Sequence, residues 1–475
     1  MDANSSTDYN PRWPLCLVGL DGLVAKLEAA RTTATPADLA ALAIDWQFLT
    51  DSTTKMDDLL QGKQPPDSQS GDYEFGPVLP VIQYELPENK IVQALIAVLR
   101  VFGMPDSPIS ESQWNADLAV LDASGAVGSD GSLVVHSDLA VADYCWVIAL
   151  IEYVLLKVGI DSSHEFVQAS GSIEVSGQSS LTLALAGDWG SGPWADPGQS
   201  AYPAQAVLDG MLATTPDYMI HLGDVYYAGT PSTSYIDSDE EKRYFTDLWK
   251  AGSRGALALN SNHEMYSGAN GLFEALGSSL FADQGGATYF AIEFQDWLIL
   301  GLDTAYYDPS ALFMTGALTD PDQLAFIQGL NPKDKLVLLL THHNGLLYDG
   351  TKPTPSTLWT QVCTALGKPP EVWYWGHIHN GIVYSSKSQA GTTLARCCGH
   401  GALPFGAAYG LQTPGGGTIP AVSYYAHTPL GGTAPPQKFR VLNGFATVCL
   451  EKGKITERFY EKGNPNAVWE LATTF

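Results

Sequence analysis

Five short apolar runs between residues 181 and 375 of this 475-residue chain each end at polar side chains of the kind that bind metals. The runs are four to seven residues long and lie a helix-length or more apart, which is typical of the strands of an α/β sheet. They cover residues 181–187, 218–223, 256–259, 336–340 and 372–375. Open α/β sheets bind their ligands at the carboxyl ends of the strands. We therefore expect the side chains that follow the five runs to meet at one edge of the fold.

The side chains at these strand ends are carboxylates, one amide and imidazoles. They are Asp188, Asp224, Asn262, His263, Glu264, His342, His343, His377 and His379. Taken singly, an Asp after a strand is usually a turn or cap residue, and a His-x-His pair is often a surface feature. Because five such blocks follow five predicted strands, a shared metal site explains them better than coincidence does. Oxygen and imidazole donors without cysteine favour iron, zinc or manganese, and Asp224 could bridge two ions.

Other strands are predicted further along the chain. Residues 289–294 and 297–302 are expected to form a hairpin through Gln295-Asp296. The tail from 439 to 459 alternates again, with a turn at 451–454. A strand over 392–397 precedes His400, which either lines the pocket or is a structural histidine.

Residues 1–170 differ from the rest of the chain in charge and in hydrophobic periodicity. They carry 24 acidic and 8 basic residues and show helical periodicity, so we expect an acidic, mainly helical region. Its most apolar stretch, residues 139–158, contains Asp143, Glu152 and Lys157, which favours a buried helix over a membrane span. No cluster of reactive side chains indicates what this region does. The sequence thus predicts two parts, residues 1–170 and residues 176–475.

The charge of the chain limits its partners. A formal charge of −27 and a pI near 4.5 disfavour nucleic acids and anionic membranes. A small anionic substrate would need a local positive feature, for which a bound metal is the simplest. The first residues do not read as a secretory signal, and the six cysteines are scattered, so we expect a cytoplasmic protein with reduced thiols. The oligomeric state is not indicated.

At the five blocks the sequence resembles the calcineurin-like metallophosphoesterases, from about residue 176 to the end of the chain. Within that superfamily it is most similar to the purple acid phosphatases. The first block departs from the usual Asp-x-His, because Gly190 stands in place of the His. The second block reads Gly-Asp-x-x-Tyr and places Tyr227 where the purple acid phosphatases have a phenolate ligand. Ser261 replaces the Gly of the usual Gly-Asn-His, a change that a backbone with negative φ tolerates.

The resemblance implies an α/β fold: a β-sandwich flanked by helices, behind the mainly helical N-terminal region. It also implies two metal ions, a ferric ion and a divalent iron, zinc or manganese. Its first ion would be held by Asp188, Asp224, Tyr227 and His379. The second would be held by Asp224, Asn262, His342 and His377. Tyr226 is the alternative phenolate, and His343 competes with His342.

The activity implied is two-metal hydrolysis of a small phosphorylated substrate, with a metal-bridging hydroxide attacking phosphorus in line. A phosphomonoesterase of the purple acid phosphatase type is expected. His263 would protonate the leaving group and Glu264 would orient His263 or cap a helix, while His343 and His400 would contact the substrate. A phosphodiesterase or nucleotide hydrolase on the same site is an alternative, because loops decide specificity. A non-catalytic metal-binding interaction protein is the other, although the intact ligand blocks argue against it.

Overall fold

The structure is a computed structural model, and it describes most of the chain from residue 146 onward. The described residues are 146–157, 159, 161–196, 199–234, 239–348, 352–386, 388–406, 408, 411, 413, 417–431 and 440–475. Most of the predicted helical N-terminal region therefore lies outside the described residues. The proposed division of the chain into 1–170 and 176–475 stays a prediction.

The described strands form two large sheets and one small one. In spatial order, the eight-stranded sheet contains β1 (Ile173–Val175), β5 (Phe290–Phe294), β6 (Trp297–Leu302), β7 (Leu336–Thr341), β10 (Val372–Trp375), β12 (Leu394–Cys398), β11 (Gly381–Tyr384) and β13 (Val422–Tyr425). The six-stranded sheet contains β16 (Trp469–Thr474), β15 (Lys454–Glu461), β14 (Gly444–Glu451), β2 (Leu181–Ala186), β3 (Tyr218–His221) and β4 (Gly255–Ala258). The small sheet pairs β8 (Leu346–Tyr348) with β9 (Pro353–Pro355).

Six α-helices and four short helical turns are described. The helices are α6 (Trp146–Lys157), α7 (Pro203–Ala213), α8 (Asn262–Met265), α9 (Asn270–Leu276), α10 (Pro321–Gly329) and α11 (Thr357–Leu366). The turns are η5 (Lys242–Thr246), η6 (Ser279–Gln284), η7 (Ala311–Phe313) and η8 (Pro332–Asp334). No helix in the described part of the chain is long and apolar enough to span a membrane.

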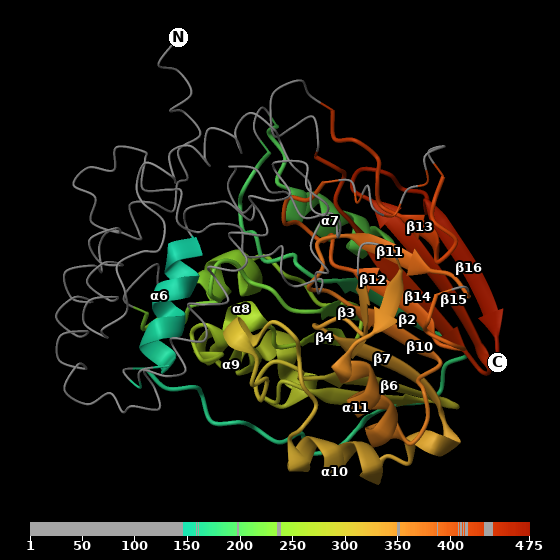
Figure 1. Ribbon diagram of the computed structural model, residues 1–475, viewed down its shortest axis with the longest axis horizontal. Helices are drawn as coiled ribbons and strands as arrows, with labels where there is room; N and C mark the ends of the chain where they lie inside the picture. Colours follow the sequence, from blue (N-terminus) through green and yellow to red (C-terminus); the bar gives the residue numbers. More distant parts are fainter. Residues whose placement is uncertain are drawn as a thin grey trace.

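The two large sheets pack face to face between two helical layers (Figure 1). Strands of both sheets contribute to the central core, for example Leu183 of β2 and Leu338 of β7. The outer face of the eight-stranded sheet packs against α10 and α11, and that of the six-stranded sheet packs against α7 and α9. Because most central strands are buried on both faces, they read as continuous apolar runs. The α/β fold with a helix-flanked β-sandwich is confirmed.

Strand register explains why the polar blocks come together. β2, β3 and β4 are parallel and end in line, since the partners Ala186, His221 and Ala258 are the last residues of their strands. β6, β7 and β10 are likewise parallel and end together at residues 302, 341 and 375. The residues after each strand thus leave the sandwich at its carboxyl edge. The five predicted strands are all present, as are the hairpin of β5 with β6 and that of β14 with β15.

One buried ion pair ties the two sheets together. Arg396 of β12 donates from Nε and Nη2 to the two carboxylate oxygens of Glu457 on β15, at 2.8 and 2.9 Å. The hydroxyl of Tyr374 donates to the same carboxylate at 2.8 Å. Such a bidentate, fully hydrogen-bonded pair fixes the relative position of two elements because breaking it leaves a buried charge unpaired.

Because two histidines are buried without hydrogen-bond partners in the described part of the chain, we expect the metal-free protein to lose stability in acid. His221 lies among aromatic rings, 4.3 Å from that of Phe245, and His400 is stacked on Phe459. Neither ring has a hydrogen-bond partner among the described residues, and burial lowers the pKa of each to about 3. The unfolded chain takes up these protons below about pH 6.5 but the folded chain does not, so stability falls with pH from 6.5 towards 3.

We expect each histidine to cost about 2 kcal/mol of unfolding free energy between pH 7.5 and pH 5. Urea unfolding in the presence of a chelator measures this loss without interference from metal release. Replacing His221 with Leu should remove about half of the loss due to the pair. Equal pH dependence in the variant and the wild type would contradict the assignment.

Candidate metal centre

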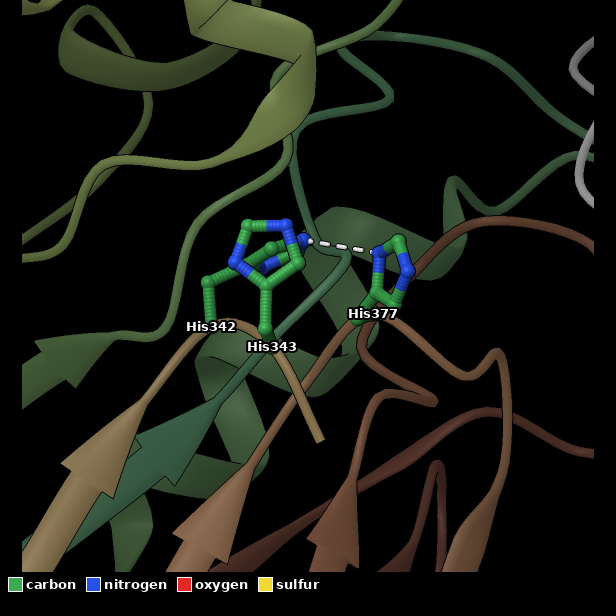
Figure 2. Close-up of side chains that lie close together, drawn as sticks. All are labelled: His342, His343 and His377. Carbon is green, nitrogen blue, oxygen red and sulfur yellow. Dashed lines mark hydrogen bonds between the residues drawn. The ribbon is translucent and has the colours of Figure 1, made fainter. Parts of the chain in front are cut away.

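Two groups of potential metal ligands lie buried at the carboxyl edge of the sandwich. One group consists of Asp188, Asp224 and His379, and the other of His342, His343 and His377. Within each group the candidate ligand atoms lie within 4.8 Å of one another. Figure 2 shows the three imidazoles of the second group, which come from the loops that follow β7 and β10. The structure thus brings together side chains that are up to about 190 residues apart in the sequence.

Three of these residues have a left-handed backbone conformation. Asp188, Asp224 and His377 have φ values of 55°, 78° and 66°, which side chains other than glycine rarely adopt. Each follows a glycine placed one or two residues after the end of a strand. Residues held in such conformations are stabilised by their surroundings and concentrate at functional sites. These turns therefore indicate that the structure maintains the positions of the three side chains at some energetic cost.

Asp224 lies between the two groups. Its Oδ1 is 3.2 Å from Nε2 of His342, and its Oδ2 is 4.0 Å from Nε2 of His379. The hydroxyl of Ser261 donates to Oδ1 at 2.5 Å. Because each carboxylate oxygen faces a different group, one side chain can serve two cations, as two-metal sites require.

The donors around His342 fit a cation. Nδ1 of His342 donates to the carbonyl of Leu222 at 2.9 Å, so a neutral ring presents a lone pair at Nε2. That nitrogen is 2.9 Å from Oδ1 of Asn262 and 3.2 Å from Nδ1 of His377. With the Asp224 carboxylate as well, nitrogen and oxygen atoms that can bind a cation converge around this point. Atoms bound about 2.0–2.1 Å from one ion are spaced by about 2.9–3.4 Å, as these are.

His342 is better suited than His343 to bind an ion. Nε2 of His343 donates to the carbonyl of Phe313 at 2.7 Å, and its Nδ1 lies 2.8 Å from the hydroxyl of Thr304. A carbonyl only accepts, so Nδ1 carries the lone pair and takes the hydroxyl hydrogen. Both ring nitrogens of His343 are therefore already used within the protein. These contacts favour His342 among the two alternatives that the sequence leaves open.

The first group combines two carboxylates, an imidazole and a phenol. Nε2 of His379 is 3.4 Å from Oδ1 of Asp188 and 3.1 Å from the hydroxyl of Tyr226. The other oxygen of Asp188 accepts the backbone N–H of His377 at 3.0 Å. Carboxylate, phenol and imidazole donors suit a hard or borderline cation such as iron, zinc or manganese.

Gly190 leaves room for the second block to approach the first. The backbones of Gly190 and Val225 pair as an isolated bridge, and a Cβ on Gly190 would lie only 2.5 Å from Cα of Val225. A histidine cannot occupy this position without moving one of the two loops. The departure from Asp-x-His is thus accompanied by a close backbone contact that only glycine permits.

The hydroxyl of Tyr226 lies near the first group, 3.1 Å from Nε2 of His379. The backbone of Tyr227 makes two hydrogen bonds: its N–H donates to Oε1 of Glu240 at 2.8 Å and its carbonyl accepts from Nδ1 of His263 at 2.7 Å. The geometry therefore favours Tyr226, the alternative phenolate, over Tyr227. The assignment of Tyr227 stays a prediction that the next experiment tests.

Iron-loaded, oxidised protein is expected to be coloured, because a phenolate bound to ferric iron gives charge-transfer absorption. The geometry predicts that Tyr226→Phe bleaches this absorption and that Tyr227→Phe retains it, and the absorption spectrum of each variant measures this. The opposite result would restore the expectation drawn from the sequence. A colourless wild type with iron bound would rule out both phenols as ligands.

The imidazole of His263 is held by a hydrogen bond from one of its ring nitrogens to the backbone. Because Nδ1–H donates to the carbonyl of Tyr227, the transferable proton of a charged ring is the one on Nε2. The ring is buried and stacks on that of Tyr226, with centroids 3.9 Å apart. These two contacts set the tautomer and plane of the imidazole, as a general acid requires.

Hydrogen bonds through the Ser261 hydroxyl connect Glu264 to Asp224. Its carboxyl group is hydrogen-bonded to the Ser261 hydroxyl, which also contacts Asp224. Burial, and then the nearby charge of Asp224, raise the pKa of Glu264 to about 8. A protonated Glu264 can donate to Ser261 and leave the serine hydrogen for Asp224. The observed orientation of His263 comes from Tyr227, so the expected orienting role of Glu264 stays a prediction.

Ser261 has a larger part than the sequence indicates. Its φ of −136° confirms that no left-handed backbone is needed there, and its side chain caps α8 by accepting the N–H of His263 at 3.0 Å. A Ser directly before a helix is a recognisable cap signal. Its contact with Asp224, 37 residues earlier, has no signal in the sequence.

The described contacts of the His400 ring are with aromatic rings and glycine backbone and not with the two ligand groups. Its ring packs between Phe405 and Phe459, against the backbone of Gly381 and Gly444. This surrounding is that of a packed core histidine, the alternative that the sequence leaves open. Substrate contact by His400 and by the fully buried His343 stays a prediction.

Comparison with known proteins confirms the family resemblance. Residues 181–381 match the family model of the calcineurin-like phosphoesterases. No curated protein matches the chain significantly. Among solved structures, the chain is similar to GAP50, the anchor in the inner membrane complex of Plasmodium, at 10% identity and a TM-score of 0.42, over 62% of this chain and 89% of that one.

Two further structures show similar overlap. Purple acid phosphatase PPD1 from yellow lupin (Lupinus luteus) seeds is 11% identical with a TM-score of 0.38, over 63% of this chain and 54% of that one. PhoD is 11% identical with a TM-score of 0.39, over 65% of this chain and 70% of that one.

Proposed function

Since residues 181–381 match the family model of the calcineurin-like phosphoesterases, we propose that the protein is a two-metal hydrolase of small phosphoric esters, with phosphomonoesters as its substrates. The observation that carries the proposal is the position of Asp224, whose two oxygens face two separate groups of ligands. A single structural ion would need only one of these groups.

The ligand assignment follows from the distances. Asp188, Asp224 and His379, with the phenol of Tyr226 or Tyr227, would hold the first ion. The second ion would be held by Asp224, Asn262, His342 and His377. A ferric ion with a divalent iron, zinc or manganese is the proposed pair. When bound, two such cations neutralise phosphoryl oxygens and lower the pKa of water at the site.

Side chains of the protein supply the proton transfer and the alignment. His263 would donate its Nε2 proton to the departing alkoxide, because Nδ1 is committed to the carbonyl of Tyr227. Glu264 and Ser261 would hold Asp224 in its bridging orientation. The candidate ligands are buried, so few competing water molecules reach their lone pairs.

A hydrolysis panel tests the proposal. Protein loaded with iron, zinc or manganese is assayed on p-nitrophenyl phosphate, bis(p-nitrophenyl) phosphate and ATP. We expect the monoester to be hydrolysed with the largest kcat/KM, activity to disappear with a chelator and to return with metal. Preference for the diester or ATP would move the function to the corresponding alternative. Absence of hydrolysis with two ions bound would indicate a non-catalytic metal-binding protein.

A further inference from the structure

The helix α6 precedes the residues that match the phosphoesterase family model and packs against residues that adjoin the candidate metal centre. In Figure 1 it lies beside α8 and α9, at the edge where the site residues emerge. We propose that Tyr153 of α6 is a positioning residue for Asn262, and that α6 thereby controls how tightly the second ion is held. This inference rests on the proposed function, because it assumes that Asn262 is a metal ligand.

The first step is the orientation of the Asn262 amide. Its Nδ2 donates to the hydroxyl of Tyr266 at 3.1 Å and faces Sδ of Met314 at 3.7 Å. Tyr266 in turn directs its hydroxyl hydrogen at Met314, which leaves a hydroxyl lone pair for the amide. With its nitrogen engaged in this way, Asn262 turns its oxygen towards Nε2 of His342. Tyr266 therefore selects the amide orientation in which oxygen is available to a cation.

The second step is the contact of Tyr153 with this support. The Tyr153 ring is buried and meets the ring of Tyr266 edge to face, with centroids 6.0 Å apart and planes at 85°. It meets Phe313 in the same manner at 5.5 Å, and its hydroxyl accepts the N–H of Leu312 at 3.3 Å. The carbonyl of Phe313 accepts from His343, beside His342. Tyr153 thus contacts both segments that flank the second group.

Two neighbouring side chains keep α6 in this place. The ammonium of Lys157 lies over the rings of Tyr153 and Phe313, at 5.1 and 4.8 Å from their centroids. The hydroxyl of Ser234 donates to Glu152 at 2.5 Å and connects α6 to the loop that follows Tyr227. The helix is therefore attached to two loops of the candidate site by polar as well as aromatic contacts.

Replacement of a residue that orients a metal ligand typically lowers metal affinity by about 10- to 100-fold. Removal of the Tyr153 ring takes away the edge-to-face contact that supports Tyr266 on the side of α6, although the ring of His263 still packs against Tyr266. The Tyr266 hydroxyl is then held less firmly, and the Asn262 amide can turn. We therefore expect Tyr153→Ala to weaken binding of the second ion by about 10-fold and to leave the first ion in place.

The experiment measures metal retention in full-length protein. Wild type, Tyr153→Ala, Tyr153→Phe and Tyr266→Phe are loaded with zinc, dialysed against graded chelator and analysed by mass spectrometry of the elements. Tyr202→Ala is the matched control, since Tyr202 is an exposed tyrosine that precedes α7. We expect Tyr153→Ala and Tyr266→Phe to retain one ion where the wild type retains two. Tyr153→Phe, which keeps the ring, and Tyr202→Ala should resemble the wild type.

Thermal unfolding in chelator separates positioning from simple destabilisation. If Tyr153→Ala lowers the melting temperature but retains both ions with wild-type affinity, the inference is overturned and Tyr153 only stabilises the fold. If Tyr153→Ala does not fold, Tyr153→Leu decides, because it removes the edge-to-face ring contact with Tyr266 but keeps an apolar side chain in the core; retention of both ions with wild-type affinity in that variant overturns the inference. A wild type that binds two ions without hydrolysis contradicts only the proposed function. A wild type that binds fewer than two contradicts both.

Discussion

Asp224→Ala protein is expected to bind neither ion stably and to lose more than about 10³-fold in phosphomonoester hydrolysis. The reason is that Asp224 is the only side chain among the described residues whose two oxygens face both ligand groups. Its removal takes one charged ligand from each position at once, whereas loss of a single stabilising donor already costs about 10²–10³ in turnover. Elemental analysis and kcat/KM on p-nitrophenyl phosphate measure the two effects.

Asp209→Ala is the control for this substitution, since Asp209 is an exposed aspartate on α7 with a hydrogen bond to Gln205. It should retain both ions and full activity. Asp188→Ala adds a graded comparison, because it should weaken the first position while the second keeps its four ligands. Retention of both ions by Asp224→Ala would show that the carboxylate does not bridge.

His263→Ala is expected to lower kcat by about 10²–10⁴-fold, the usual contribution of a general acid, while both ions stay bound. The side chain is not needed for either proposed ligand set, and its tautomer is fixed by the carbonyl of Tyr227. Protonation matters most for a poor leaving group, so the loss should be larger on an alkyl phosphate than on p-nitrophenyl phosphate. Rates on the two substrates, with metal content measured on the same samples, check both statements.

An equal loss on both substrates would place His263 in substrate binding rather than in proton transfer. Unchanged turnover on the alkyl phosphate would remove it from the mechanism. Tyr226→Phe serves as a comparison, because it keeps the ring that stacks on His263 while it removes the hydroxyl beside His379.

The strands and their polar ends could be predicted from the sequence because both are local signals. A buried parallel strand is a continuous apolar run, and the residue after it is fixed by chain order, as with Asp188 after β2. The same holds for the hairpin of β5 and β6, whose two-residue connection sets the register of Phe294 with Trp297.

The choice between adjacent residues could not be predicted, because it depends on backbone conformation and on partners far away. Tyr226 and Tyr227 follow a left-handed Asp224, and only the resulting path of the loop decides which phenol reaches His379. What distinguishes His343 from His342 as a ligand candidate is its hydrogen bonding to Thr304 and Phe313, which lie 39 and 30 residues earlier in the chain.

The position of α6 is a further example of a long-range contact. An apolar helical segment such as residues 139–158 predicts a buried helix, of which α6 covers residues 146–157. Its periodicity does not say which surface it covers. The contact of Tyr153 with Tyr266, 113 residues later, is visible only in the fold.

The most direct test of the two-metal site is the metal content of the wild-type protein. Purified protein is loaded with iron, zinc or manganese, freed of excess metal by gel filtration and analysed for metal per chain. The proposed bridging role of Asp224 predicts two ions per chain, and none after Asp224→Ala. One ion or none in the metal-replete wild type would contradict the account.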